Sequence, residues 1–347
     1  MVALSGGVDS AVSALLTLRA GLSVIGVTLD LPGADVAGAR EICRLLGIEH
    51  RVAEAGAALE EQVIRPFVTA YAQGRTPNPC VLCNPRVKFA TLMALADELG
   101  RDTIVTGHYA RLASVHGERH LLRARDRSKD QSYVLYRLEQ PVLARLMLPT
   151  GELTKDEVRK LADDAGLPAT GRPESQDVCF TPEGEPGRLV VTRCPQAGRP
   201  GPILNTAGEV IGQHRGLAHY TVGQRRGLGL GGPGGPRYVL RILPERNAVV
   251  AGTERDLWAS RCDVEAVHMV GSPPAEVFAA QVMTRYRGAE TPAQVELHGE
   301  RAVIRFQRPH RAPAPGQSAV FYQGERLVGG GIIVPPQSCS QTPAAPP

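Results

Sequence analysis

The string Ser-Gly-Gly-Val-Asp-Ser at residues 5–10 constrains the fold more than any other part of the sequence. An apolar run before it predicts a buried strand, and the apolar spacing from Val8 onward predicts a helix that begins at once. A strand, a glycine turn and a helix in this order direct backbone N–H groups and the positive helix end toward an anion. An isolated Gly-Gly would indicate only a turn, whereas this longer string predicts a phosphate-binding loop. Its spacing differs from that of the common G-x-x-x-x-G-K-S/T loop.

Each residue type in this string has a chemical use at a phosphate site. Gly6 and Gly7 let a phosphate approach the backbone, and the hydroxyls of Ser5 and Ser10 are further donors. Asp9 carries the wrong charge for such a site, so we expect it either to hold a magnesium ion or to orient the loop. The string resembles the pyrophosphate loop of the ATP pyrophosphatases, which split ATP into AMP and pyrophosphate. The resemblance implies ATP but does not name the acceptor.

The first 110 residues alternate short apolar strands with helical patterns, which predicts an α/β fold with a parallel sheet and helices on both faces. We expect strands at 23–31, 49–52 and 103–106, helices at 34–46, 59–72 and 87–99, and then a hairpin at 110–124. Further along, a capping box at 154–157 predicts a helix that runs to residue 165. Ligands bind such sheets at the carboxyl ends of the strands. The Ser5–Ser10 loop and Gly107 should therefore meet at one nucleotide, with His108 beside it.

After about residue 185, glycine and proline become frequent and short alternating strands replace the helices. This change predicts a domain boundary near residue 185, then a small central domain at 186–258 and a C-terminal β-barrel of about five strands at 259–335. The resemblance of the loop implies that residues 1–185 are an ATP-pyrophosphatase domain. The proline-rich, uncharged stretch at 336–347 predicts a disordered tail.

Composition excludes several classes of protein. No apolar run reaches the roughly 20 residues that span a bilayer, and no basic segment of a signal peptide opens the chain, so we expect a cytoplasmic protein. A net charge of +4 permits nucleic-acid binding without requiring it. Only four of the 39 basic residues are lysines (Lys88, Lys129, Lys155 and Lys160), so a lysine can mark a position where arginine does not serve.

Seven cysteines without an export signal favour metal binding or catalysis over a disulfide framework. Cys80 and Cys83 present two thiols from one turn, and a C-x-x-C pair alone is half a zinc site, a redox pair or chance. Cys179 lies on a loop before the change of domain. We expect Cys43 and Cys262 to be core residues.

The order of the motifs along the chain resembles one family closely. The Ser5–Ser10 loop is followed by TPNPxxxCN at 76–84, TGHYA at 106–110, KDQSY at 129–133, SQDVCF at 175–180, HYTVGQRRGLG at 219–229, RYR at 285–287 and GGGII at 329–333. This series is similar to that of the bacterial tRNA-specific 2-thiouridylases, the MnmA family, and it covers nearly the whole chain.

The resemblance implies thiolation of the wobble uridine in the anticodons of certain tRNAs. ATP would activate the C2 oxygen of uracil as an adenylate, pyrophosphate would leave into the Ser5–Ser10 loop, and sulfur would displace AMP. By the family pattern, Cys179 accepts sulfur as a persulfide, and Cys83 is its partner thiol and nucleophile. The sulfur source that the resemblance implies is a persulfide donor protein or sulfide. Both thiols should then have a lowered pKa and access to solvent.

The resemblance also assigns binding residues. Contacts to ATP, with Mg²⁺, are implied for Ala3, Leu4, Ser5, Gly6, Gly7, Val8, Asp9, Ser10, Leu29 and Gly107. Contacts to tRNA are implied for Asn78, Pro79, Cys80, Lys129, Asp130, Gln131, Arg285 and Tyr286. Arginine and lysine would meet phosphate, and Tyr286 would stack on a base.

The chain departs from the family pattern at Cys80, where most members carry aspartate. Cys80, Cys83 and Cys179 then supply three thiols, the ligand set of a [4Fe–4S] cluster with one open iron. Two sulfur routes follow: such a cluster, which we favour, and a persulfide route in which Cys80 is a spare thiol or a resolving partner.

Three other functions stay open at this point. A thiolase of the same loop family that makes 4-thiouridine or 2-thiocytidine would lack the 219–229 motif and the barrel. An amidotransferase-like ATP ligase would need a glutaminase partner. A non-enzymatic nucleic-acid-binding module would hold structural zinc at the cysteines.

Overall fold

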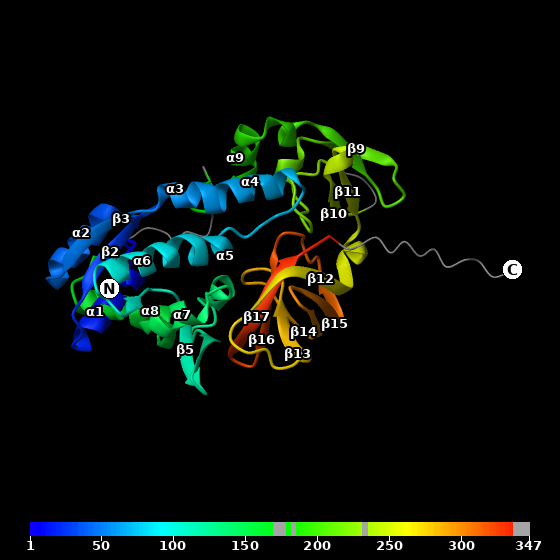
Figure 1. Ribbon diagram of the computed structural model, residues 1–347. Coiled ribbons are helices and arrows are strands. Elements are labelled where there is room, and N and C mark those ends of the chain that lie inside the picture. The colour runs from blue at the N-terminus through cyan, green and yellow to red at the C-terminus, as the bar shows by residue number, and fades with distance from the viewer. Residues whose placement is uncertain (169–177, 182–184, 231–234, 336–347) are drawn as a thin grey trace.

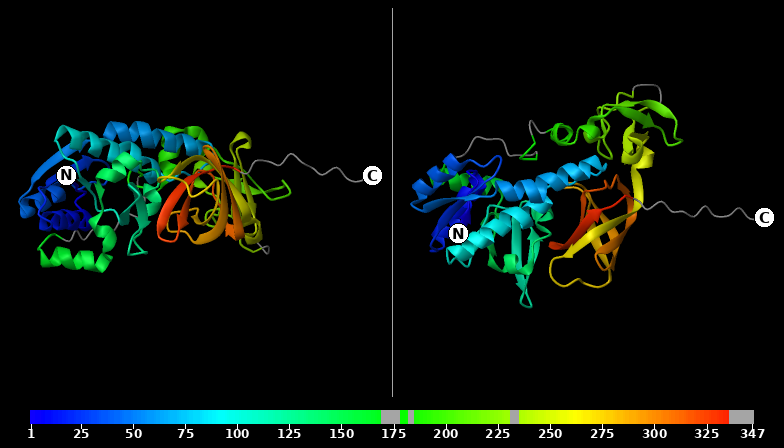
Figure 2. Two further views of the ribbon diagram at one scale, coloured as in Figure 1. Left: turned by 60° about the horizontal axis from the view of Figure 1, so that its bottom comes forward. Right: turned by 45° about the horizontal axis from the view of Figure 1, so that its top comes forward.

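The computed structural model describes residues 1–168, 178–181, 185–230 and 235–335 (Figure 1). The tail predicted at 336–347 and residues 175–177 of the motif around Cys179 lie outside these ranges. Figure 1 and both views of Figure 2 place an α/β domain at one end of the molecule and two β-rich bodies at the other. None of the helices in the described ranges combines the length and the apolar character that a membrane crossing requires.

Within the described ranges, the N-terminal sheet has five strands in the order β3-β2-β1-β4-β7, and every neighbouring pair runs parallel. They are β1 (Val2–Ala3), β2 (Ile25–Asp30), β3 (Glu49–Glu54), β4 (Ile104–Val105) and β7 (Leu146–Met147). From β1 the chain adds β2 and β3 on one side and later β4 and β7 on the other. The strand order therefore reverses between β1 and β4, which is where such folds bind ligands. The Ser5–Ser10 loop follows β1 and Gly107 follows β4, so both lie at this reversal.

Helices cover both faces of this sheet, as predicted. Successive strand residues point to opposite faces, so Val2 and Leu4 belong to one buried cluster and Val27 to another. The first cluster packs against α1 (Val8–Arg19), α2 (Val36–Leu46) and α8 (Lys155–Asp164), and the second against α3 (Gly56–Leu59) and α6 (Ala90–Glu98). Cys43 on α2 is buried, which confirms it as a core residue.

Two predicted helices begin earlier than expected. The helix expected at 59–72 starts with α3 and passes through a π-helical segment at Glu60–Ile64 into α4 (Arg65–Ala72). The helix expected at 87–99 starts with α5 (Cys80–Cys83) and passes through a second π segment, Asn84–Phe89, into α6. Pro85 lies at the start of that segment, where a missing N–H is tolerated. Cys80 and Cys83 therefore sit in the first turn of a long helix.

The predicted hairpin joins the two ends of the molecule. Its strands are β5 (Ala110–Val115) and β6 (Glu118–Arg123), and it turns at His116 and Gly117, which both have positive φ. β6 also pairs with the barrel strand β17, Leu122 opposite Arg326. The hairpin of the α/β domain is thus continuous with the sheet of the barrel.

The C-terminal part of the described chain is a closed barrel of six strands in the order β12-β15-β14-β13-β16-β17, because β12 also pairs with β17. These are β12 (Trp258–Met269), β13 (Val277–Met283), β14 (Glu290–His298), β15 (Arg301–Arg311), β16 (Ser318–Gln323) and β17 (Arg326–Ile333). The sequence missed β17 as a strand because of its glycines. A Cβ at Gly330 would lie 3.0 Å from the ring of Tyr136, so the strand needs glycine there. Cys262 on β12 is buried, as expected.

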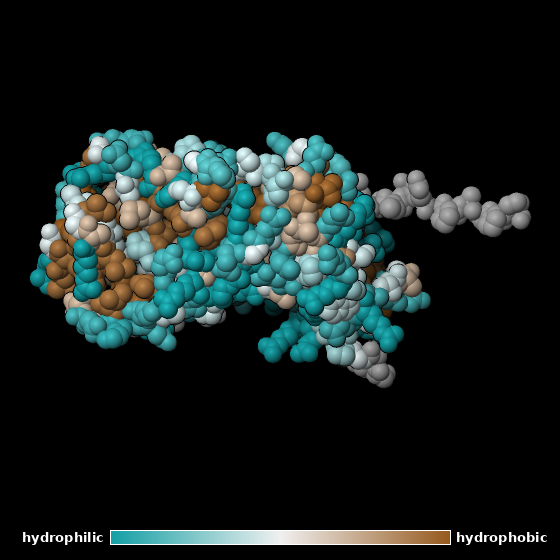
Figure 3. Space-filling view, turned by 90° about the horizontal axis from the view of Figure 1, so that it is seen from below, coloured by the Kyte–Doolittle hydropathy of each residue, from teal (hydrophilic) through white to brown (hydrophobic). Residues whose placement is uncertain are grey.

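The central body holds, within the described ranges, a four-stranded sheet in the order β10-β11-β8-β9. Its strands are β8 (Gly201–Leu204), β9 (Val210–His214), β10 (Tyr238–Leu243) and β11 (Ala248–Gly252). Two further helices were not predicted: α7 (Gln140–Arg145) and α9 (Pro186–Arg193). Phe67 of α4 and Val190 of α9 share a buried cluster, which links this body to the α/β domain. Seen from below, polar residues cover most of the barrel side, whereas hydrophobic residues gather mainly over the α/β domain (Figure 3).

Candidate active site

The Ser5–Ser10 loop has a shape that requires glycine at position 6. Gly6 has a φ of 81°, and a Cβ on it would lie 2.6 Å from the Cβ of Asp35. The hydroxyl of Ser10 donates to the carbonyl oxygen of Gly7 at 2.8 Å and accepts the N–H of Ser5 at 3.2 Å. Ser10 is buried and closes the loop internally, while Ser5 is exposed.

The loop leaves the N-terminus of α1 open to an anion. Gly7 is the N-cap of α1 and, as a glycine, provides no side-chain cap for the N–H groups of this first turn. Such N–H groups and the helix dipole attract negative charge. A Cβ on Gly107 would lie 2.8 Å from the backbone nitrogen of Ser10, so the turn after β4 packs directly on this loop. The two segments meet, as the sheet order predicts.

Asp9 is engaged by two partners. The ammonium of Lys155 donates to both carboxylate oxygens of Asp9, at 2.7 and 2.8 Å, and the hydroxyl of Tyr109 donates to one of them at 2.7 Å. Of the two roles that the sequence offered for Asp9, these contacts support orientation of the loop. Sequence reasoning assigned Lys155 only to the capping box of α8, and the rarity of lysine was the one signal that could have pointed to it.

The three predicted thiols occupy different environments. Cys80 and Cys179 are exposed, while Cys83 is buried. A Cβ on Gly33, in the loop after β2, would lie 3.9 Å from the Cβ of Cys179. Cys179 is therefore at the same carboxyl edge of the sheet as the Ser5–Ser10 loop, although 169 residues separate it from Ser10.

The expected lowering of the cysteine pKa values was wrong. Burial raises the pKa of the Cys83 thiol to about 11, and it also raises the pKa of Cys179. The positive charge of Lys88 opposes both shifts, but the loss of hydration outweighs it. The expected solvent access holds for Cys179 and fails for Cys83. Because Cys80 and Cys179 each raise the pKa of Cys83, the three thiols are electrostatic neighbours.

Lys88 links the thiols to the Gly107 turn. Burial, and then the charge of Lys88, lower the pKa of His108 to about 3, so this imidazole is neutral. His108 lies 2.9 Å from the hydroxyl of Thr106 and stacks on Phe89 with ring centroids 6.0 Å apart. Lys88 thus acts electrostatically on His108, Cys83 and Cys179 together.

The thiols do not form a preassembled metal site. In the ranges that the structure describes, no three Cys, His, Asp or Glu side chains are grouped as a metal ion requires. Cys80, Cys83 and Cys179 have the donor chemistry of an iron–sulfur site but not its geometry. The cluster stays a prediction.

Two residues of the KDQSY motif, both assigned to tRNA, are bonded within the protein. The carboxylate of Asp130 accepts hydrogen bonds from the N–H groups of Ala124 and Ser132, at 3.0 and 3.1 Å. The side-chain oxygen of Gln131 accepts the N–H of Tyr109 at 2.9 Å, and the N–H of Gln131 donates to the carbonyl oxygen of Tyr109 at 2.7 Å. The side chains of Asp130 and Gln131 thus hold the backbone next to the site in place. The neighbouring Lys129 is partly exposed.

Arg285 is also held internally. Its guanidinium donates to the carbonyl oxygens of Val222 and Ala312, at 2.9 and 3.0 Å, and burial lowers its pKa. It therefore joins a loop of the central body to the barrel. The contact with a phosphate that the resemblance implies for Arg285 stays a prediction.

The remaining tRNA assignments cluster at the start of α5. The side chain of Asn78 accepts the N–H of Cys80 at 3.1 Å, and Pro79 is buried. Tyr286, from the barrel, packs on Tyr133 with ring centroids 6.0 Å apart, and Cys80 is among the charges that raise its pKa. The structure thus brings Tyr286 near Cys80.

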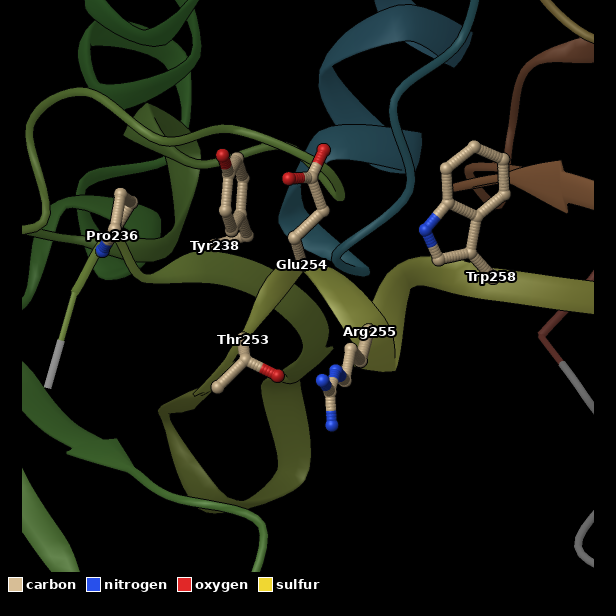
Figure 4. Close-up of a pocket in the computed structure, with 6 residues that line it drawn as sticks. All are labelled: Pro236, Tyr238, Thr253, Glu254, Arg255 and Trp258. Atoms are coloured by element: carbon tan, nitrogen blue, oxygen red, sulfur yellow. The ribbon is translucent and has the colours of Figure 1, made fainter.

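A separate open pocket of about 810 Å³ lies between the central body and the barrel. Its lining residues are Pro236, Tyr238, Thr253, Glu254, Arg255 and Trp258, and Figure 4 shows Tyr238, Glu254 and Trp258 projecting to one side and Arg255 to the other. The residues that line it include none that the sequence assigns to ATP, sulfur or tRNA.

Fold and site together define a class: a nucleotide-binding α/β domain with a pyrophosphate-type loop, followed by two small β domains. Residues 1–183, 190–253 and 259–333 match the families described as tRNA methyl transferase HUP domain, tRNA methyl transferase PRC-barrel domain and aminomethyltransferase beta-barrel domain.

Relatives with high coverage identify the family. The chain is 45% identical to the tRNA-specific 2-thiouridylase MnmA of Chloroflexus aurantiacus, over 97% of this chain and 98% of that protein. It is 46% identical to the protein of the same name from Desulforudis audaxviator, over 96% and 97%. The chain belongs to the MnmA family of tRNA-specific 2-thiouridylases. Among solved structures, it is similar to the U34-tRNA thiolase NcsA of Methanococcus maripaludis with its [4Fe-4S] cluster, with a TM-score of 0.34 and 20% identity over 51% of this chain and 59% of that one.

Proposed function

We propose that this chain is a tRNA sulfurtransferase that adenylates the wobble uridine with ATP and replaces its 2-oxygen by sulfur, releasing AMP and pyrophosphate. One observation carries the proposal: the phosphate-type loop at Ser5–Ser10 and the thiol of Cys179 lie at one edge of the sheet, in a chain that matches proteins named tRNA-specific 2-thiouridylase along nearly its whole length. A tRNA substrate fits the cytoplasmic location expected from the sequence.

In the first step, the C2 oxygen of uracil attacks the α-phosphorus of ATP. The bond to the β-phosphate breaks, and pyrophosphate leaves into the loop, where the N–H groups at the start of α1 bind it. Mg²⁺ bound with ATP would offset the negative charge of the phosphates, while Asp9, held by Lys155 and Tyr109, would orient the loop. The oxygen at C2 is now part of a phosphate ester and can depart as AMP.

In the second step, sulfur enters through the thiols. A persulfide donor protein loads Cys179, whose exposed position allows delivery: the Cys179 thiolate takes the outer sulfur of the donor persulfide, and the donor leaves as a thiol. The terminal sulfur of the Cys179 persulfide attacks C2 of the activated uracil, and AMP departs with the original oxygen. The thiolate of Cys83 then attacks the inner sulfur, which frees the thiocarbonyl and leaves a Cys83–Cys179 disulfide. A thiol reductant must reduce this disulfide before the next turnover.

The test is nucleoside analysis of an unmodified tRNA transcript after incubation with the protein, ATP and a sulfur donor. We expect 2-thiouridine at the wobble position, lost in Cys83→Ala and Cys179→Ala and kept in the control Cys194→Ala, a partly exposed cysteine with no assigned role. Formation of 4-thiouridine or 2-thiocytidine instead, or activity without Cys179, would overturn the proposal.

The same assay separates the two sulfur routes. The persulfide route with Cys80 as a spare thiol predicts that Cys80→Ala keeps activity. The cluster route predicts that Cys80→Ala is inactive and that anaerobically purified protein contains iron and acid-labile sulfide.

A further inference from the structure

Lys155 and Asp9 form a buried ion pair at the mouth of the phosphate-type loop. They are 146 residues apart in sequence, yet the ammonium lies within 2.8 Å of both carboxylate oxygens. The side chain of Lys155 is only 8% exposed and that of Asp9 is 31% exposed. An exposed ion pair contributes little to stability, whereas an ion pair with one deeply buried partner holds both charged groups in a fixed place.

The backbone around Lys155 is fixed independently of Asp9. Thr154 and Glu157 form a complete capping box at the start of α8. The N–H of Lys155 donates to the carboxylate of Asp126 at 3.0 Å. The ammonium is therefore delivered to Asp9 from a rigid helix start, not from a mobile side chain on the surface.

The charge of Asp9 matters because of where this residue lies. Asp9 is in the first turn of α1, the same turn whose N–H groups face the anion site. An uncompensated carboxylate there would repel any phosphate group, and this repulsion would cancel the attraction that the helix dipole provides. The Lys155 ammonium cancels that charge, and the Tyr109 hydroxyl holds the carboxylate in place.

We propose that Lys155 is a positioning residue of the pyrophosphate loop: it neutralises Asp9 and fixes its carboxylate, so that the loop can hold an anion. The inference rests on the proposed function, because it concerns the pyrophosphate that the reaction releases. A compact ammonium suits this place, with its nitrogen 5.8 Å from the ring centroid of Tyr109.

The test is a double-mutant cycle on pyrophosphate binding, measured by calorimetry on the full chain. Lys155→Met should weaken pyrophosphate binding at least tenfold, because it leaves Asp9 uncompensated. Adding Asp9→Asn to that variant should restore most of the loss, because the repelling charge is gone. The control is Lys160→Met on the same helix, whose ion pair with Asp164 is exposed, and it should bind as the wild type does.

Two results would overturn the inference: unchanged affinity in Lys155→Met, or a double variant that binds no better than Lys155→Met. If Lys155→Met does not fold, Asp9→Asn alone decides, since charge neutralisation predicts that it does not weaken pyrophosphate binding, whereas a carboxylate that holds a metal predicts a large loss. The measurement needs neither tRNA nor sulfur. A chain that makes no 2-thiouridine but shows the recovery would refute the proposed reaction and leave this inference standing.

Discussion

Arg123 is the residue whose replacement should most weaken the junction between the α/β domain and the barrel. Its side chain is 2% exposed and pairs with Glu290 of the barrel at 2.7 Å and with Asp130 at 3.7 Å. Its guanidinium carbon lies 3.4 Å from the ring centroid of Tyr322, also in the barrel. One buried cation thus holds two acids and an aromatic ring from both sides of the junction.

The size of the effect follows from burial. Removing one partner of a buried ion pair costs about 3–5 kcal/mol, because the other charge is left uncompensated. Glu290 is 30% exposed and can be partly hydrated, so we expect Arg123→Met to lower the free energy of unfolding by about 3 kcal/mol, the lower end of that range. The matched control is Arg125→Met, whose pair with Glu157 is exposed on both sides and should contribute roughly 0–1 kcal/mol.

The assay is urea unfolding followed by two probes, one in the barrel and one in the α/β domain, because a chain with several domains need not unfold in one step. In Arg123→Met, the barrel and the α/β domain should unfold at separate urea concentrations, since their link is weakened. Replacing Glu290 by Gln in the same variant should recover part of the loss. The reasoning is refuted if Arg123→Met is no less stable than Arg125→Met.

Three further predictions concern the site and its supports. Alkylation by iodoacetamide should be fast at exposed Cys80 and slow at buried Cys83. Because burial raises the pKa of Cys83 to about 11, its thiolate fraction should rise about tenfold per pH unit between about pH 7 and 9, and the rate of the disulfide-forming step should rise with it. A rate of that step that does not depend on pH would contradict this. Gly6→Ala should abolish ATP binding, because a Cβ would meet the neighbouring loop at 2.6 Å, while Gly56→Ala, with no atom within 4 Å, should bind ATP normally in the same titration. Arg285→Met should speed proteolysis between the central body and the barrel without changing ATP affinity, because it removes two backbone ties between them; equal cleavage rates would argue against that role.

Much of the fold could be predicted because its elements depend on local patterns. The alternation of strands and helices in the first 110 residues, and the Thr154 capping box, are encoded by neighbours in sequence. The misses have physical causes. Pro85 concealed that a helix begins at Cys80, since a π segment accommodates the proline. β17 was missed because its glycines are needed for close packing against another domain, which no local pattern reveals.

The parts of the site that follow from the order of the strands could be predicted, whereas contacts between side chains that are distant in sequence could not. The loop at Ser5–Ser10 and its meeting with Gly107 follow from sheet order. The pairing of Lys155 with Asp9 depends on tertiary packing of α8 against α1. The raised pKa of Cys83 likewise depends on burial that the sequence does not state.

The central claim is that uracil becomes reactive through a bond from its own C2 oxygen to AMP. A tRNA transcript whose wobble uridine carries ¹⁸O at C2 tests this claim directly, with mass analysis of the AMP formed in the presence of the protein, ATP and a sulfur donor. The account predicts one AMP for each 2-thiouridine, with the label in the phosphate of that AMP. Label released as water, or nucleotide consumed only to ADP, would contradict it.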